Sequence, residues 1–276
     1  MIFTRRITVA HKALAFLQKD WRVAISYKLQ FISSIAGVLI STMVFYFFSN
    51  FVGQNLSQSL QQYGGNYFAF VLVGIALADY LVVSTETFSG AIRSGQVNGT
   101  FEALLVTPTS ILTILITSYI YPFLFTTFRI LSYILLGVFC FGVEFHVHNF
   151  WICLLTFFLT LLPFLGMGLL SAAFIILFKQ GSPINWVLGV SSTLLGGVLY
   201  PVSALPAWIK PFSLVFPLTY GIEAMRKVLL AHATFKDIQN NLFILIFFSV
   251  IFIISGIISV KYSLKVARKQ GTLLHY

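Results

Sequence analysis

Charged side chains are scarce in this sequence, and acidic ones are the scarcest. Only 9% of the 276 residues are charged, with 7 Asp and Glu against 17 Lys and Arg. Soluble domains carry about 25% charged residues, so these few could not cover a water-facing surface. Since 58% of the residues are hydrophobic, the composition indicates an integral membrane protein.

Cysteines and nucleotide-binding motifs are also lacking. The 2 cysteines, Cys140 and Cys153, lie inside apolar stretches, so no structural disulfide is expected. No G-x-x-x-x-G-K-[ST] sequence occurs, so we expect no ATP site on this chain. The net charge of +10 gathers in short segments beside apolar runs. That placement is typical of membrane orientation signals, and nucleic acid is not expected as a partner.

Six apolar runs have about the 20 residues that a membrane-spanning helix needs. They cover residues 29–50, 66–88, 110–141, 150–178, 184–201 and 239–260. We therefore expect an all-α integral membrane protein with one transmembrane domain over 1–276, surrounded by membrane lipids. Lys and Arg concentrate in the two terminal segments, which places both termini in the cytoplasm.

The N-terminal segment 1–28 has a different pattern. Leu14, Leu17, Trp21 and Ile25 recur at steps of three and four, the spacing of one helix face. Basic residues occupy the other faces. This pattern predicts an amphipathic helix on the inner membrane surface, and a helix packed on a partner protein is the alternative.

Four prolines interrupt the apolar segment that precedes the last span. Broken backbone cannot face lipid, because its unpaired N–H and C=O groups are costly there. We predict an outer re-entrant helical hairpin within 201–231 that plugs a pathway. A loop lying flat on the headgroups, anchored by Trp208 and Tyr220, is the alternative. The residues assigned to this outer gate are Pro201, Pro206, Trp208, Pro211, Pro217, Tyr220 and Glu223.

The end of the same segment predicts a helix over 220–231. Thr219 is a residue type that caps helices. Within the helix, Glu223 faces Arg226 and Lys227 at i+3 and i+4, a spacing that supports ion pairs.

The connection 93–108 predicts a short helix on the inner side. Thr100 can cap Phe101–Val106, and Ser110 can cap the next span. Glu102 then lies in the first turn, where the helix dipole favours a negative charge. A short helix parallel to the membrane suits docking into a groove on another protein, and an ordinary connecting loop is the alternative.

Three charged residues lie within predicted spans. Asp79 and Arg129 are expected at similar depth, and pairing them offsets a cost of at least about 3 kcal/mol for an isolated charge. Such a pair is either structural or a polar point on a transport path. Glu86 lies nearer the cytoplasmic end, where it faces an inner vestibule or Arg93.

The outer stretch "EFHVH" offers Glu144, His146 and His148. An extended loop would aim them in one direction. A metal site needs three or four converging ligands, so we expect polar residues at headgroup level and no metal.

Two stretches resemble one protein family. "NGTFEALLVTPTS" (98–110) and "YPVSALPAWIKPFSLVFPLTYGIEAMR" (200–226) resemble the inner loop and outer signature of the membrane subunits of type 2 ATP-binding-cassette exporters. The resemblance implies a half-transporter: two copies form the pore, and two separate ATPase subunits bind ATP and Mg²⁺. It also implies that 101–107 is a coupling helix seated in the ATPase, with Glu102 as its main polar contact. The residues assigned to coupling are Arg93, Phe101, Glu102, Leu105 and Thr107.

The family resemblance implies a transport subunit that is not itself an enzyme. The outer motif is nearer the drug and small-lipophile branch, which implies a hydrophobic or amphipathic cargo and a bacterial plasma membrane. Export of a lipid-linked glycan is the alternative. A channel or carrier that uses Asp79, Glu86 and Arg129 without an ATPase is a second class. An intramembrane enzyme at 144–148 ranks last, because no nucleophile–base arrangement accompanies the histidines.

Overall fold

The computed structural model describes residues 66–269 apart from 108, 146–148 and 180–182. Before residue 66 it describes positions 14, 15, 17–19, 21, 22, 33, 36, 37, 40, 42–47, 49, 60 and 63. The regular elements of this described part are all helical, as the sequence predicts. Their bounds are α3 Tyr67–Val97, α4 Phe101–Val106, α5 Ile111–Phe141, α6 Phe150–Phe178, α7 Pro183–Leu195, η2 Val202–Ala204, α8 Lys210–Ser213, α9 Pro217–Leu230 and α10 Phe235–Lys269.

Four of these helices, α3, α5, α6 and α10, are long and apolar enough to cross a bilayer. They match the predicted spans at 66–88, 110–141, 150–178 and 239–260, although α3 and α10 extend well beyond the predicted ends. By their length and composition, these four helices support a multi-pass membrane protein.

The other two predicted spans have different outcomes. Most of 29–50 lies outside the described residues, and the described residues from 33 to 49 are helical. α7 ends at Leu195, and the glycine at 197 has φ +77°, so the predicted end at 201 is wrong. Thirteen residues of helix rise about 20 Å, short of the roughly 30 Å of a hydrocarbon core.

Side-chain caps fix where the long helices begin. Asn66 and Asn149 each accept a backbone N–H of the first turn, at 3.1 and 3.0 Å. Ser110 accepts the N–H of Thr113 at 3.2 Å, which confirms its predicted role. These bonds satisfy N–H groups that have no partner within their own helix.

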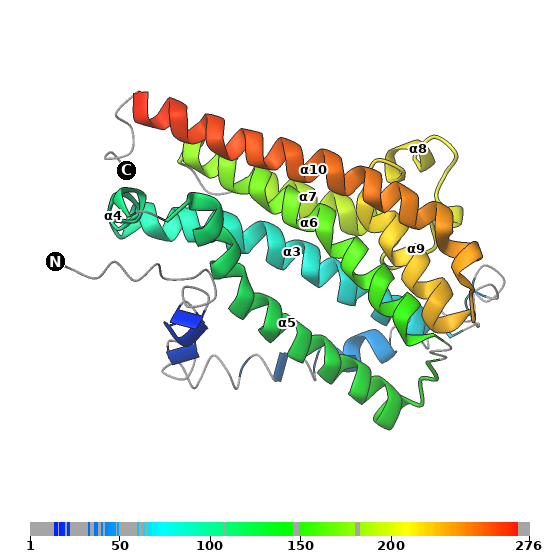
Figure 1. Ribbon diagram of the computed structural model, residues 1–276. Helices are drawn as coiled ribbons and strands as arrows, with labels where there is room; N and C mark the ends of the chain where they lie inside the picture. Colours follow the sequence, from blue (N-terminus) through cyan, green and yellow to red (C-terminus); the bar gives the residue numbers. More distant parts are fainter. Residues whose placement is uncertain are drawn as a thin grey trace.

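α6 lies between α3 and α10, and two of its glycines permit the close approach (Figure 1). A Cβ at Gly166 would lie 2.4 Å from the carbonyl carbon of Phe252 in α10. A Cβ at Gly168 would lie 2.4 Å from the carbonyl oxygen of Ser84 in α3. Small residues at such crossings let helix backbones meet. α3 and α6 form the centre, with 72% and 67% of their most apolar stretches buried, against 17% in α5 and 22% in α10.

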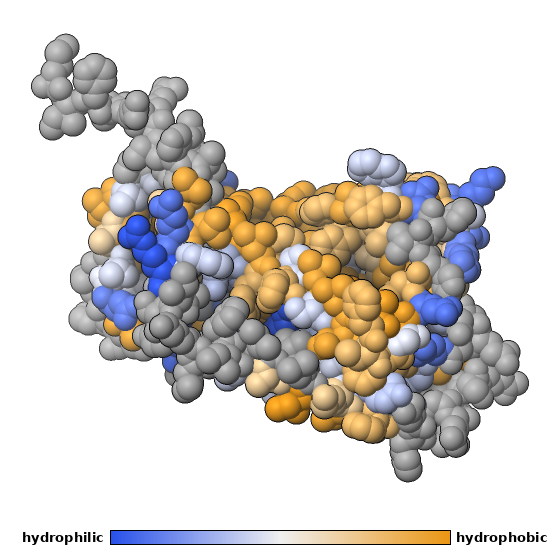
Figure 2. Space-filling model, turned by 90° about the horizontal axis from the view of Figure 1, so that it is seen from below, coloured by the Kyte–Doolittle hydropathy of each residue, from blue (hydrophilic) through white to orange (hydrophobic). Residues whose placement is uncertain are grey.

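The two ends of the bundle carry different elements. α4 and the last turns of α10 lie at one end, the α4 end, while α8 and α9 lie at the other, the α9 end (Figure 1). Figure 2 shows apolar side chains over the middle of the molecule and hydrophilic ones towards both ends. A bilayer-spanning bundle needs this distribution, since its middle faces hydrocarbon.

Candidate functional site

At the α4 end, α3 passes into α4 through a tight turn. Gly99 has φ +65°, a backbone conformation that favours glycine, and Thr100 N donates to Gly95 O at 2.9 Å. Thr100 stands at the N-cap position, as predicted, but its side chain makes no capping hydrogen bond. Its hydroxyl lies 3.5 Å from Gly95 O instead. The turn therefore holds α4 through backbone and glycine geometry.

Phe101 anchors α4 to the bundle. It is only 2% exposed and belongs to a core cluster with Ile92 of α3, Ile111 of α5 and Leu264 of α10. Gly95 leaves the space for it, since a Cβ there would lie 3.3 Å from the Phe101 Cβ. Phe101 therefore positions α4, and its ring is not part of the helix's exposed surface.

The exposed surface of α4 lies at its end. Val106 is 86% exposed, Thr107 is exposed and Leu105 is half-buried. Arg93 is exposed on α3, and Glu102 lies in α4 with its side chain outside the described part. The sequence analysis missed Val106. The spacing could have identified it. Val106 follows the buried Phe101 by five residues, which turns its side chain about 140° around the helix, away from the buried side.

Three polar bridges join α3 and α5. Arg129 Nη2 lies 2.9 Å from Asp79 Oδ2, which confirms the predicted pairing. The other bridges join hydroxyl groups 2.8 and 2.9 Å apart, in Tyr80 with Thr127 and Ser84 with Tyr119. Both charged side chains remain partly exposed, at 29% and 28%. The bridges fix the register of α5 on α3 while leaving the ion pair within reach of the outside of the bundle.

A buried polar cluster at α7 escaped the sequence analysis. Asn185, 8% exposed, donates from Nδ2 to Ser89 Oγ at 2.7 Å and to Thr85 O at 3.3 Å. Its Oδ1 accepts a hydrogen bond from Ser171. The cluster joins α3, α6 and α7. A single Asn in an apolar run has no periodic pattern, so only the tertiary contacts identify it.

Two other predicted polar sites remain dispersed. Glu86 and Arg93 are both exposed on α3, seven residues apart, which is about two turns along the same helix face. Of the "EFHVH" stretch, Glu144 is described, whereas His146 and His148 lie outside the described residues. Within the described part of the chain, no three His, Cys, Asp or Glu residues come together as metal ligands.

At the α9 end, the proline segment forms short helical pieces, as predicted: η2, α8 and α9. α9 begins at Pro217 with Phe216 at its N-cap position, so the prediction that Thr219 caps a helix from 220 is wrong. Proline suits the first helical position, where its missing N–H would have had no partner. The Thr219 hydroxyl instead donates to Ser213 O at 2.7 Å, which ties α9 to α8.

The residues assigned to the outer gate divide by exposure. Pro201 and Pro217 are buried, Tyr220 and Glu223 are half-buried, and Pro206, Trp208 and Pro211 are exposed. Trp208 is 73% exposed, and Val215 beside α8 is 62% exposed. Large apolar side chains on one surface mark contact with a membrane or another protein.

Arg226 in α9 is a buried charge, for which the sequence analysis predicted an ion pair with Glu223. It is 2% exposed. Nε donates to Phe70 O at 3.0 Å, and the two terminal nitrogens donate to Gly197 O and Val198 O at 2.7 Å each. A buried charge is tolerated only when it is fully hydrogen-bonded. Arg226 thus hydrogen-bonds to these three carbonyls, and not to Glu223 as its i+3 position predicted.

Two neighbours complete the Arg226 site. The Phe70 ring lies 3.3 Å from the guanidinium carbon, a cation–π contact. Gly74 leaves the space, since a Cβ there would lie 2.6 Å from an Arg226 nitrogen and 2.5 Å from Val198 O.

Glu223 forms a second link at the α9 end. The Tyr63 hydroxyl donates to Glu223 Oε2 at 2.5 Å, and Lys227 Nζ lies 3.2 Å from Oε1, which confirms the predicted i+4 pair. Burial, followed by the hydrogen bond to Glu223, raises the pKa of Tyr63. The carboxylate thus connects α9 to Tyr63, which precedes the start of α3 at Tyr67.

A membrane-spanning helical bundle with a short anchored helix at one end and broken helices at the other has the build of a transporter's membrane subunit. Residues 13–230 match the family model of the ABC-2 type transporter. The match covers most of the chain, and the chain belongs to this family.

Individual relatives agree with the family assignment. The chain is 24% identical over 189 residues to the inner membrane transport permease YadH of Escherichia coli strain K12, an alignment covering 68% of this chain and 72% of that protein. The YadH permeases of Escherichia coli O157:H7 and Shigella flexneri align with the same values. The expected type 2 ABC permease subunit is therefore confirmed, and the family implies partnership with an ABC ATPase.

Proposed function

We propose that this chain forms the pathway of an ABC exporter that moves a hydrophobic or amphipathic cargo, such as a drug or a lipid, by alternating access. Two copies line the pathway, and two separate ATPase subunits bind ATP and Mg²⁺. The observation that carries the proposal is α4, a helix of 6 residues at one end of the bundle that is anchored by Phe101 and exposes Val106. An ATPase subunit can bind such an exposed helix while the bundle stays folded.

Movement of α4 reaches the rest of the bundle through Phe101. The core cluster around its ring takes residues from α3, α5, α6 and α10. α3 is in turn bridged to α5 through Asp79 and Arg129, and it is tied to α9 through Arg226. A tilt of α3 therefore moves α5 and α9 together. ATP-driven closure of the ATPases brings two α4 helices together, and the α9 ends part and release cargo.

The contacts with the ATPase come from α4 and the end of α3. Val106 supplies an apolar contact, and Glu102 supplies the polar one. Arg93, Leu105 and Thr107 surround them. Phe101 acts from behind, by keeping α4 in place.

The α9 end forms the outer gate. We place the segment 201–231 as a re-entrant hairpin that closes the pathway towards the outside. The exposed Trp208 supports its contact with lipid. The bonds of Arg226 cover the broken backbone after α7 with protein, which a segment within the membrane requires.

We place the chain in the plasma (inner) membrane of a bacterium, the membrane named for the YadH permeases, with both termini in the cytoplasm. The α4 end carries the basic last turn of α10, Arg268 and Lys269. Basic residues mark the cytoplasmic side of membrane helices.

The test is co-purification and transport with Val106→Arg. We expect the ATPase to co-purify with the wild-type chain and its capture to fall about tenfold with Val106→Arg, as for a central interface residue. Val215→Arg, an exposed valine at the α9 end, is the matched control and keeps its ATPase. Normal ATPase capture and ATP-driven export with Val106→Arg would show that α4 is not the docking element.

A carrier without an ATPase is the second candidate, because Asp79 and Arg129 pair within the bundle and stay partly exposed. Purified chain in vesicles without ATPase distinguishes the two. Flux that follows pH and disappears with Asp79→Asn would support the carrier, and flux only with ATPase and ATP supports the exporter.

A further inference from the structure

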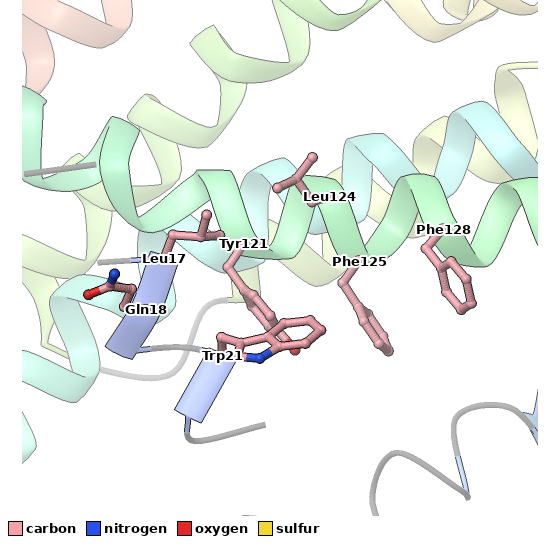
Figure 3. Close-up of a pocket in the computed structure, with 7 residues that line it drawn as sticks. All are labelled: Leu17, Gln18, Trp21, Tyr121, Leu124, Phe125 and Phe128. Carbon is pink, nitrogen blue, oxygen red and sulfur yellow. The ribbon is translucent and has the colours of Figure 1, made fainter. Parts of the chain in front are cut away.

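The groove drawn in Figure 3 lies between the N-terminal segment and α5 and has a volume of about 460 Å³. Leu17 and Trp21 line one side, and Tyr121, Phe125 and Phe128 line the other. The lining is almost wholly apolar, so nothing in it distinguishes a lipid tail from a helix of another subunit. A surface that selects its occupant needs charge or hydrogen bonds as well, and the end of α10 carries such charge.

One face of α10 changes from apolar to basic near the α4 end. α10 runs along the outside of the bundle (Figure 1), and Ile254 and Ile258 are exposed on it. Lys261 and Lys265 follow at steps of three and four residues, the spacing of one helix face, and both are exposed. The two lysines therefore continue the face that the apolar residues turn towards lipid.

The other face of the same turns belongs to the bundle. Val260, Leu264 and Ala267 are buried in the core cluster that also holds Phe101 of α4. The exposed basic residues of these turns, which we call the basic face of α10, are Lys261, Lys265, Arg268 and Lys269. The basic face therefore points away from α4 and towards the surroundings of the bundle.

The length of the apolar stretch places the first lysine at the edge of the hydrocarbon. Between Asn241 and Lys261, α10 carries no charged residue. About 20 residues of helix rise about 30 Å, the thickness of a hydrocarbon core. Lys265 follows about 6 Å further along the axis, at headgroup level. Tyr262 is 63% exposed beside them, and tyrosine is enriched at this level.

The basic face carries positive charge that the chain does not balance. Residues 261–269 contain no Asp or Glu, and within the described part of the chain none of the four basic residues forms an ion pair. Basic residues at a membrane surface attract anionic lipids, at roughly fivefold in affinity for each residue. A lipid with net negative charge therefore complements this face in position and in sign.

We propose that the basic face of α10 binds the headgroup of an anionic phospholipid in the leaflet at the α4 end. Lys261 and Lys265 hold the phosphate, and the lipid tails lie along Ile254 and Ile258. Since the opposite face of these turns buries Phe101, the bound lipid supports the helix end that holds α4. The inference does not rest on the ATPase partner or the cargo, so its test can fail while the proposed function stands.

The test uses one tryptophan beside the basic face in the full chain. The four native tryptophans are replaced by Phe: Trp21, Trp151, Trp186 and Trp208. Tyr262→Trp then supplies the reporter. The protein is placed in phosphatidylcholine nanodiscs with an increasing fraction of phosphatidylglycerol or phosphatidylcholine brominated on one acyl chain. We expect half-maximal quenching at a mole fraction of phosphatidylglycerol about tenfold below that of phosphatidylcholine.

A second reporter separates a site from general attraction. Phe247→Trp in the same background lies on the same helix at 61% exposure, about 21 Å along the axis from Lys261. We expect both lipids to quench it equally. Equal quenching at position 262, or the same preference at both positions, would overturn the proposal, because a generic lipid boundary gives these results.

Charge variants test the two lysines directly. With the reporter at position 262, Lys261→Gln with Lys265→Gln should lower the preference for phosphatidylglycerol to about twofold or less. Lys236→Gln, an exposed lysine near the other end of α10, is the control and should leave it unchanged. A preference that survives the double substitution in full would overturn the proposal.

An acidic surface of the ATPase is the other possible occupant, and co-purification tests it. Lys261→Gln with Lys265→Gln that keeps its ATPase while it loses the lipid preference supports the proposal. Reduced ATPase capture by this variant, together with equal quenching by both lipids in the parent protein, would show that the basic face docks the ATPase and would overturn the proposal.

Discussion

The two ends of α3 are held in opposite ways. At the α9 end, Arg226 donates three hydrogen bonds of 2.7 to 3.0 Å, one of them to Phe70 O in α3. At the α4 end, apolar contacts and a glycine turn connect α4 to the bundle: Phe101 is buried in a core cluster, and Leu104 and Leu105 pack against it. Hydrogen bonds demand distance and direction, whereas apolar contacts are non-directional. The contacts at the α9 end therefore fix distances and directions, whereas the apolar contacts at the α4 end constrain direction less.

Removal of the Arg226 guanidinium is expected to give the largest loss of stability among these tests. Arg226→Met leaves three buried carbonyls without their donors, and we expect a loss of about 4 kcal/mol in stability. Thermal unfolding of the purified chain in mild detergent measures it. Lys227→Met on the same helix removes a half-exposed charge and should cost far less. An Arg226→Met protein that melts with the wild type would mean that the polar bonds do not fix this end.

At the opposite end, Phe101→Ala removes the apolar anchor. The substitution is expected to cost about 3 kcal/mol of packing, felt as detachment of α4 and not as unfolding of the bundle. Hydrogen–deuterium exchange should accelerate over 100–107 and stay unchanged in α9. Phe139→Ala, at an 80% exposed position, is the control. Faster exchange at both ends would show that they are not independent.

Gly74→Ala tests the tight packing around Arg226 without removing a charge. Its Cβ would lie 2.5 Å from Val198 O and 2.6 Å from an Arg226 nitrogen, so we expect a cost of about 2 kcal/mol from overpacking. Gly90→Ala is the matched control, because it lies in the same helix and a Cβ there meets nothing within 4 Å. The difference between the two melting temperatures measures the effect, and equal values would disprove the tight fit.

The smallest effect is expected from Tyr63→Phe. This change removes the hydrogen bond to Glu223 and leaves the Glu223–Lys227 pair in place, so about 1 kcal/mol should be lost. Tyr46→Phe is a control for the loss of a tyrosine hydroxyl. A stability loss as large as that of Arg226→Met would show that Glu223, and not Arg226, makes the main stabilising contact at the α9 end.

Hydropathy and capping residues were enough to predict the four long helices. The start of α5 at Ser110 and the short α4 also followed from local signals, because a cap and a turn involve neighbours in sequence. The Asp79–Arg129 pair followed from depth alone, since two opposite charges in adjacent spans have few other partners.

The sequence failed where distant segments decide the outcome. Local spacing paired Arg226 with Glu223, but its hydrogen-bond partners lie near residues 70 and 197, far along the chain. The family resemblance likewise assigned Phe101 to the contact with the ATPase, although the residues of α10 that bury it come more than 150 positions later. The end of α7 was missed because the apolar run continues past the turn at Gly197.

The core around Phe101 includes Leu264 and Ala267 from the last turns of α10. These turns therefore pack against α4 and hold it in place, in addition to ending the last long helix. A deletion that begins at Leu264 would leave α10 long enough to cross the membrane, yet it would remove two of the residues that bury Phe101. Truncations and fusion points should accordingly lie beyond Lys269, so that the contacts of Leu264 and Ala267 with the Phe101 cluster remain.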